Sequence, residues 1–398
     1  MKILHTSDWH FGHQLYGYDR REEHFDFAMQ LVDIVQRERP DALVISGDVF
    51  DIGSPSVAVQ QLYAETLMNL HRVAPDMPIV VTAGNHDSPS RLEVYRDVWG
   101  AHNVHIIGTL GRSGDDVDWQ RHFITIPGKG IIVALPHIYA QNYPATDMPD
   151  RVSAFYKKLQ AKVEEINVNN LPIILMAHAA VRGCDLTGHR RMQEDSIGNI
   201  EYIDLETFGS VFDYIALGHI HHAQTLKGLP TARYSGSPVA VSFDENYPHS
   251  VSIVNVEHGK TPEIETVEIK TIRPLVTLPQ KPVPFDEAVD KLAAYPDDEE
   301  AYIRLNVLSD NGLPADYNER IALATANKKC KFCTVNVTRE TPLGLNSMTG
   351  SMTPDEFRQL KVTDVAQQFM SSKSIDNELG EKYLRMISDI EKSISHED

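Results

Sequence analysis

The sequence predicts an α/β fold with much parallel sheet over residues 1–270, followed by a small second α/β unit. Short apolar runs alternate with stretches whose apolar residues recur at helical spacing, which indicates strands and helices in alternation. Four of the apolar runs also end in a cluster of polar residues, at 41–48, 77–87, 171–178 and 212–222. At 398 residues, the chain is long enough for two or three domains.

The predicted elements follow one another along the chain. Residues 1–7 begin the fold as a strand, and helices are expected at 23–37 and 56–72. The Pro-rich stretch 271–285 predicts a domain boundary. The patterns beyond it predict helices at 285–295 and 315–327, strands at 301–307 and 331–338, and a helical tail from residue 352.

Composition and charge narrow the class of protein. No apolar run reaches the ~18 residues of a membrane span, and the N-terminus lacks the pattern of a signal peptide. The three cysteines do not make a disulfide framework, so we expect a cytoplasmic protein with no membrane association. The net charge of −19 argues against a general nucleic-acid binder. It remains compatible with a nuclease whose metals or basic partner supply positive charge.

Residues that can bind metal ions follow five of the predicted strands. Asp8 and His10 lie two residues apart after the first strand, and on an extended chain they would project to the same side. Because sites in α/β sheets collect at the carboxyl ends of strands, we expect all these residues to form one site. The seven predicted ligands are Asp8, His10, Asp48, Asn85, His178, His219 and His221.

This set of ligands predicts two metal ions. Oxygen and nitrogen donors without thiolates suit manganese, iron or zinc at a reactive site better than a structural zinc or calcium ion. Seven donors exceed the need of one ion, and Asp48 is the natural carboxylate to bridge two. Such a site would be positive and would suit an anionic phosphoryl group. His86, beside Asn85, is predicted to act as an acid over the substrate or to stabilise charge in the transition state.

Five sequence blocks resemble the calcineurin-like metallophosphoesterase superfamily, in order along the chain. They are D-x-H at 8–10, GDVFD at 47–51, GNHD at 84–87, His178, and GHIH at 218–221. More narrowly, the stretches ILHTSDWHFG, SGDVFDIGSPS, VTAGNHDS, IALGHIHHAQ and YSGSPVAVSFDE resemble the nuclease subunits of the bacterial SbcCD double-strand-break repair complexes. This resemblance covers most of the chain.

The resemblance implies an architecture and a division of ligands. It implies two central sheets flanked by helices, a small α/β capping domain and a helical C-terminal tail. The domains would be a nuclease domain at 1–270, a DNA-binding cap at 271–342 and a partner-docking segment at 350–398. One manganese ion would be held by Asp8, His10, Asp48 and His221, and a second by Asp48, Asn85, His178 and His219.

The resemblance also implies an activity and partners. The enzyme would act as a 3′-to-5′ exonuclease on duplex ends and as an endonuclease on single strands and hairpins, with His86 assisting cleavage. ATP would modulate it through an ATPase partner with a coiled coil. The subunit would form a homodimer within a heterotetramer and serve DNA repair, recombination and replication at the nucleoid.

The C-terminal tail carries an apolar stripe at helical spacing that has two interpretations. The stripe could pack on its own domain, which is the usual fate of such a face. It could instead dock on another chain, which the resemblance favours. Its residues are Leu379, Tyr383, Met386, Ile387, Ile390 and Ile394.

Two other functions fit the same metal motif. One is a phosphatase or a phosphodiesterase for small substrates, and the other is a DNA-end-binding scaffold without catalysis. The extra domain and the tail favour the nuclease, because an enzyme for small substrates has no evident need of them.

Several residues beside the motifs are expected to have structural roles. Trp9 should point away from the metal ions into the packing, and His5 should be packed within its strand. Asp51 and Asp87 should hold loops through backbone hydrogen bonds. His24 is expected on a solvated helix surface.

Overall fold

The computed structural model describes residues 1–114, 116–146, 148–188, 202–339, 383 and 386. They form two compact units, and the division between these falls within three strands near residues 277, 304 and 334. The first unit contains Met1–Thr277, Pro296–Arg304 and Lys328–Thr334. The predicted docking segment 350–398 lies outside the described residues except for Tyr383 and Met386, which are helical with exposed side chains.

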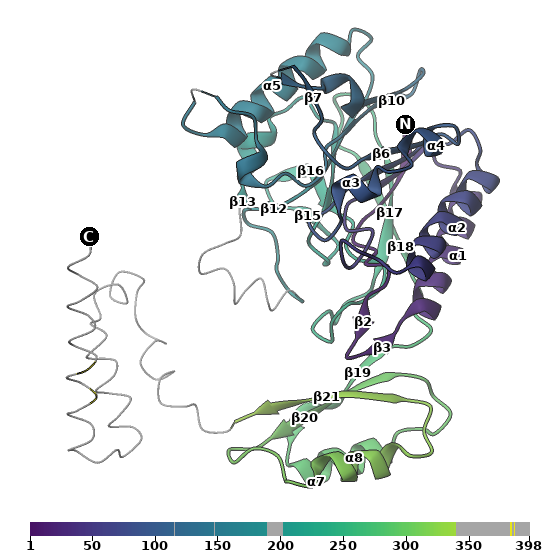
Figure 1. The fold of residues 1–398 in the computed structure, drawn as a ribbon, viewed down its shortest axis with the longest axis vertical. Coiled ribbons are helices and arrows are strands. Elements are labelled where there is room, and N and C mark those ends of the chain that lie inside the picture. The colour runs from purple at the N-terminus through teal and green to yellow at the C-terminus, as the bar shows by residue number, and fades with distance from the viewer. Residues whose placement is uncertain (115, 147, 189–201, 340–382, 384–385, 387–398) are drawn as a thin grey trace. The chain divides into compact units, whose positions relative to one another are not determined.

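Two six-stranded sheets build the first unit (Figure 1). The first sheet has the order β18-β17-β1-β4-β5-β6 and the second has the order β15-β16-β14-β11-β10-β9. Each contains four neighbouring parallel strands, which confirms the predicted parallel sheet. The strands of the first sheet are β1 (Lys2–Thr6), β4 (Ala42–Ser46), β5 (Ile79–Thr82), β6 (Val104–Ile107), β17 (Ser250–Asn255) and β18 (Glu263–Glu268). Those of the second are β9 (Phe123–Ile126), β10 (Gly130–Ala134), β11 (Ile173–His178), β14 (Tyr214–Gly218), β15 (Gln224–Leu226) and β16 (Leu229–Tyr234).

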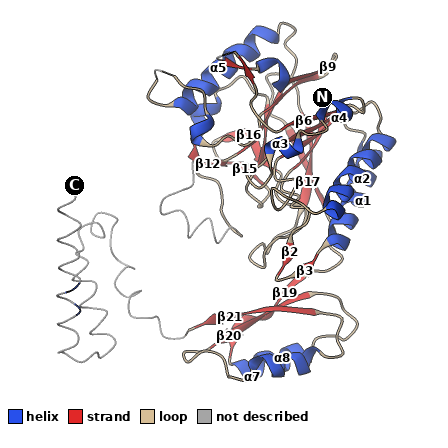
Figure 2. Ribbon diagram, in the orientation of Figure 1, coloured by secondary structure: helices blue, strands red, loops and turns tan. Residues whose placement is uncertain are grey.

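The sheets pack face to face and the helices cover their outer faces (Figure 2). Because side chains alternate across a strand, each central strand contributes to two apolar layers. In β4, Ala42 and Val44 belong to the layer that includes residues of both sheets, while Leu43 and Ile45 belong to the layer under the helices. Helices α1 (Arg21–Glu38) and α2 (Val57–Val73) cover the first sheet, and α5 (Arg151–Ile166) covers the second. This arrangement confirms two central sheets flanked by helices.

Shorter elements complete the first unit. The side chain of Ser56 accepts a hydrogen bond from the backbone nitrogen of Val59 and so caps α2 at its predicted start. Among the described residues of this unit, the remaining helices are α3 (Pro89–Leu92), α4 (Arg96–Gly100), η1 (Trp119–His122), η2 (Ala140–Asn142) and η3 (Leu205–Phe208). Three two-stranded sheets pair β2 (Gln14–Leu15) with β3 (Tyr18–Asp19), β7 (Arg112–Ser113) with β8 (Asp116–Val117), and β12 (Ala180–Val181) with β13 (Tyr202–Ile203).

The C-terminal third of the described chain contains a three-stranded sheet of order β19-β20-β21. It comprises β19 (Leu275–Val283), β20 (Tyr302–Leu308) and β21 (Lys331–Thr338), with helices α7 (Phe285–Ala293) and α8 (Tyr317–Thr325) between them in sequence. The helices and strands predicted between residues 285 and 338 are therefore confirmed. The Pro-rich stretch 271–285, which was predicted only as a domain boundary, contains the strand β19. Prolines are tolerated there since β19 is an edge strand, where a missing N–H need not break a ladder.

Polar contacts join the two large sheets in the interior. His5 of β1 lies 2.9 Å through Nδ1 from the hydroxyl of Tyr214 in β14, and Ser46 donates to the carbonyl oxygen of Ala216. The packed position expected for His5 is confirmed, and its burial lowers its pKa to about 3. The surface position expected for His24 is wrong. Its ring is buried and lies 5.5 Å from that of Phe11, because this face of α1 packs on the loop after β1.

None of the described helices combines the length and the apolar character that crossing a membrane requires.

The lowered pKa of His5 predicts a pH-dependent stability. The pKa in the folded protein lies below the ordinary value of 6.5, so the neutral ring stabilises the fold above that pH and this stability is lost as the pH falls. Between about pH 7 and about pH 5, His5 should account for a loss of about 2 kcal/mol in the free energy of unfolding. In urea denaturation, the free energy of unfolding of His5→Gln should depend less steeply on pH than that of the wild type. Equal slopes for both proteins would contradict the assignment.

Candidate metal centre

The seven predicted ligands gather at the carboxyl ends of five strands, three from the first sheet and two from the second. The loops after β1, β4 and β5 contribute Asp8, His10, Asp48 and Asn85, while β11 and the loop after β14 contribute His178, His219 and His221. Strand β4 packs against β11 and β14, which brings the two groups of loops together. The polar clusters therefore meet across a sandwich and not along one sheet.

Turns of the backbone bring two pairs of ligands into the cluster: the D-x-H pair, Asp8 and His10, and the H-x-H pair, His219 and His221. The expectation that Asp8 and His10 project from one side of an extended strand is wrong, because β1 ends at Thr6. Strand β14 likewise ends at Gly218, before His219 and His221. Asp8, His10 and His219 all have positive φ angles, of 54°, 46° and 101°. Backbone hydrogen bonds from the nitrogens of Asp8 and His10 to the carbonyl oxygens of Gly47 and Asp48 hold the first turn against the loop after β4.

Glycines make the close approach of these loops possible. A Cβ atom on Gly47 would clash with the ring of His178, and one on Gly84 would clash with the carboxylate of Asp48. A Cβ atom on Gly218 would clash with the carbonyl oxygen of Ser46, across the gap between the sheets. Each of these glycines stands directly before a predicted ligand, so the absence of a side chain there is a condition for the site.

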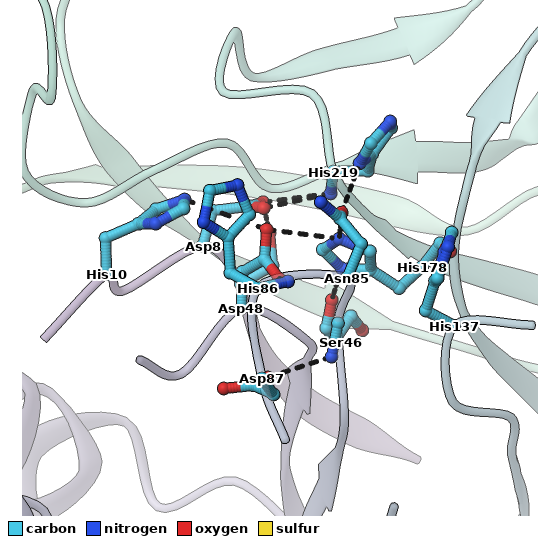
Figure 3. Close-up of polar contacts among 12 residues, drawn as sticks. Asp8, His10, Ser46, Asp48, Asn85, His86, Asp87, His137, His178 and His219 are labelled. Atoms are coloured by element: carbon cyan, nitrogen blue, oxygen red, sulfur yellow. Dashed lines mark hydrogen bonds and ion pairs between the residues drawn. The ribbon is translucent and has the colours of Figure 1, made fainter. Parts of the chain in front are cut away.

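The donor atoms form two groups with Asp48 between them (Figure 3). Asp8, His10 and His221 offer atoms that all lie within 4.8 Å of one another, as do Asp48, His178 and His219. The Asp48 carboxylate oxygen Oδ2 lies 3.3 Å from Nε2 of His178 and 3.8 Å from Nε2 of His10. Asn85 joins the second group through its side-chain oxygen, which lies 3.0 Å from Nε2 of His178 and 2.9 Å from Nδ1 of His219.

Three histidines are oriented by acceptors on the side away from the cluster. The Nδ1 atom of His178 donates to the carbonyl oxygen of Ser46 at 2.8 Å. The Nδ1 atom of His221 lies 2.9 Å from Glu245, and that of His10 lies 3.3 Å from Asp51. Each contact directs the Nε2 atom into the cluster, which is how proteins hold histidine ligands of metal ions. The residues present therefore fit divalent ions in their chemistry as well as in their positions.

The electrostatics of the cluster favour positive charge at its centre. Burial opposes protonation of His10, but the Asp51 and Asp48 carboxylates outweigh it and raise the pKa of His10 to about 9. His178 is likewise buried, and the Asp48 carboxylate raises its pKa to about 9. Burial opposes ionisation of Asp48, yet the neighbouring His178 holds its pKa well below the usual range. Buried carboxylates of this kind are stabilised by cations.

His86 differs from the seven because its side chain is exposed beside the cluster. Its backbone nitrogen donates to Asp48 at 2.9 Å, and its Nδ1 donates to the carbonyl oxygen of Asp51 at 2.8 Å. The ring stands edge-on to that of His10, with 4.9 Å between centroids. This placement leaves Nε2 available to a molecule that binds at the cluster.

Two further predictions about the neighbouring residues are confirmed. The buried carboxylate of Asp87 accepts hydrogen bonds from the backbone nitrogens of Val49, Phe50 and Gly84, and so ties together the loops after β4 and β5. Trp9 is fully buried and packs against Phe11 and Phe27. The backbone nitrogen of Asp51 donates to the carbonyl oxygen of Phe11 and so joins two loops, as expected, and the Asp51 carboxylate also pairs with His10.

Sequence reasoning missed two residues of the site. One is Glu245, which is buried in the structure and ends the sequence block YSGSPVAVSFDE. The signal for it was a carboxylate that closely follows an apolar run. His137 donates from Nδ1 to the carbonyl oxygen of His178 at 2.9 Å. It follows the apolar strand β10 as the other site residues follow theirs, but Pro136 obscured the pattern.

Comparisons with known proteins identify the family of this chain. The sequence model of the calcineurin-like phosphoesterase family matches residues 1–223. The chain is 33% identical over 313 residues to the SbcD protein of the SbcCD nuclease from Rhodobacter capsulatus, covering 74% of this chain and 76% of that protein. It is 30% identical to the SbcD protein of Escherichia coli, with 70% of each covered, and 33% identical to that of Bacillus subtilis, with 69% and 71% covered. The chain therefore belongs to the calcineurin-like phosphoesterase family and, within it, to the SbcD nucleases.

Proposed function

We propose that this chain is the nuclease subunit of an SbcCD-type complex and hydrolyses DNA phosphodiesters with two divalent metal ions, manganese being the preferred one. The observation that carries the proposal is the convergence of seven oxygen and nitrogen donors in two groups with Asp48 between them. The identity of 30–33% to three SbcD nucleases supports DNA as the substrate.

The two groups of donors define the proposed metal positions. One ion would be held by Asp8, His10, Asp48 and His221, and the other by Asp48, Asn85, His178 and His219. When bound, two such ions neutralise charge on the phosphodiester and activate the attacking water. The chain's own contribution is to hold these ligands at fixed orientations through Ser46, Asp51 and Glu245.

His86 is proposed to serve the leaving group. Its Nδ1 is engaged by the carbonyl oxygen of Asp51, so a proton on Nε2 can be delivered to the leaving oxygen or can stabilise the negative charge that develops there. Its exposure at the edge of the cluster supports contact with a substrate and sets it apart from the buried ligands Asp48 and His178.

The family supports a wider proposal about partners and activity. We infer 3′-to-5′ exonuclease action on duplex ends and endonuclease action on single strands and hairpins, modulated by ATP through an SbcC-type ATPase. The net charge of −19 supports a partner that contributes basic surface, because phosphate contacts require it. The proposed parts are the nuclease domain at 1–270, a DNA-binding cap at 271–342 and a docking segment at 350–398, in a homodimer within a heterotetramer.

The central test is cleavage of labelled duplex and hairpin DNA with manganese, with and without an SbcC-type partner. The chain should cleave both substrates, and a chelator should stop it. Rapid hydrolysis of p-nitrophenyl phosphate without action on DNA would contradict the proposal and favour a phosphatase.

His86→Ala should bind manganese as the wild type does but cleave DNA about 100-fold more slowly. His258→Ala is a matched control, because His258 follows β17 at the end of the first sheet opposite to the site.

A second prediction concerns Glu245, which orients His221 through a 2.9 Å contact. Glu245→Gln keeps the shape of the side chain but removes the negative charge that supports the imidazole. Manganese affinity measured by isothermal titration calorimetry should fall about tenfold or more. The exposed residue Glu257 provides the control Glu257→Gln, which should bind manganese with unchanged affinity. If both variants bound manganese with the affinity of the wild type, Glu245 would not support the site.

A further inference from the structure

A pocket of about 430 Å³ adjoins the metal centre on the side of His178 and His219. It shares Asn85, His178 and His219 with the cluster and continues past His137 and Tyr139 to Tyr202. In Figure 3, His137 lies beyond His178, at the opposite end of the cluster from His10. The volume falls in the range of about 300–1,000 Å³ that is usual for small-ligand sites, so it exceeds what a phosphate group alone would fill.

The lining of this pocket contrasts with the charge of the rest of the molecule. Among the described residues that line it, none is Asp, Glu, Lys or Arg, although the chain carries a net charge of −19. Aromatic rings contribute much of the wall: His137, Tyr139, Tyr143, Tyr156 and Tyr202. Among the described lining residues a phosphate finds no Lys or Arg partner, whereas a flat, uncharged heterocycle meets apolar and aromatic surface.

Tyr139 is the ring most accessible to a ligand. Its side chain is 43% exposed, whereas Tyr143 and Tyr156 are buried. The hydroxyl of Tyr139 donates to the carbonyl oxygen of Asn85 at 3.3 Å, and its ring stands at 89° to that of His137, with 4.6 Å between centroids. His137 is itself fixed by its hydrogen bond to the carbonyl oxygen of His178. An exposed aromatic ring is thus tied to the backbone of two predicted metal ligands.

We propose that this pocket receives the nucleobase of the nucleotide joined to the scissile phosphate, with Tyr139 as its stacking platform. The inference rests on the proposed function, because a phosphodiester at the metal centre places the attached nucleoside beside Asn85, His178 and His219. Stacking on an aromatic face accepts every base, since each has a π-face. The pocket therefore favours nucleotide substrates over simple phosphodiesters without selecting a sequence.

The test uses three chromogenic phosphodiesters that each carry one p-nitrophenyl leaving group. Two are the p-nitrophenyl esters of thymidine 5′-monophosphate and thymidine 3′-monophosphate, and the third is methyl p-nitrophenyl phosphate, which has no base. With the full chain and manganese, kcat/KM for at least one thymidine ester should exceed that for the methyl ester about tenfold. Tyr139→Ala should abolish this preference, so that the ratio of kcat/KM for the thymidine ester to kcat/KM for the methyl ester falls to about one.

Two variants separate stacking from structural effects. Tyr139→Phe removes the hydrogen bond to Asn85 but keeps the ring, and it should retain most of the preference. Tyr95→Ala removes another exposed tyrosine, outside the pocket, and should behave as the wild type does. Equal kcat/KM for all three esters in the wild type, or a preference that survives Tyr139→Ala, would overturn the inference alone. Failure to hydrolyse any ester or any DNA would overturn the proposed function and, with it, this inference.

Discussion

The close approach of β4 to β11 and β14 is the contact on which the site depends. At this point the carbonyl oxygen of Ser46 accepts the Nδ1 proton of His178, and Gly47 and Gly218 leave the space that the ring and the opposing backbone occupy. Any side chain at either glycine would push the strand ends apart. The two halves of the metal centre come from different sheets, so the distances between its ligands depend directly on how these sheets pack.

The loops that carry the ligands are held by a small number of polar anchors. Left-handed backbone at Asp8, His10 and Asp48 costs about 1–2 kcal/mol per residue, and such conformations persist only where the surroundings fix them. Asp87 restrains the loop that carries Asp48 through hydrogen bonds from the backbone nitrogens of Val49, Phe50 and Gly84. The carbonyl oxygens of Gly47 and Asp48 restrain the other loop, because they accept hydrogen bonds from the backbone nitrogens of Asp8 and His10. The hydrogen bonds around the ligands thus maintain the strained backbone conformations on which the positions of the ligands depend.

The sequence was sufficient for the fold class and for the residues that meet at the site, because both follow from local signals: apolar runs, helical spacing and polar strand ends. The two sheets were implied by the family resemblance alone, and local signals could not assign the strands to them, since the pairing of β1 with β17 joins residues about 250 positions apart. The turn conformation of Asp8 and His10 could not be predicted either, because a D-x-H pattern does not distinguish a turn from an extended strand. His24 and the strand β19 were misjudged for a related reason: burial and strand pairing depend on neighbours that are distant in sequence.

The pairing of β1 with β17 also bears on how the protein is made. Strand β1 lies between β4 and β17, so its second edge stays open until residues near 255 have left the ribosome. Through that interval, an apolar strand with unpaired backbone groups can pair with another chain, which is the usual origin of aggregation during synthesis. Asp8 and His10 stand directly after this strand, whereas His221 and Glu245 are synthesised more than 200 residues later. The metal centre is therefore a late product of folding, and chaperone demand should concentrate on the first half of the chain.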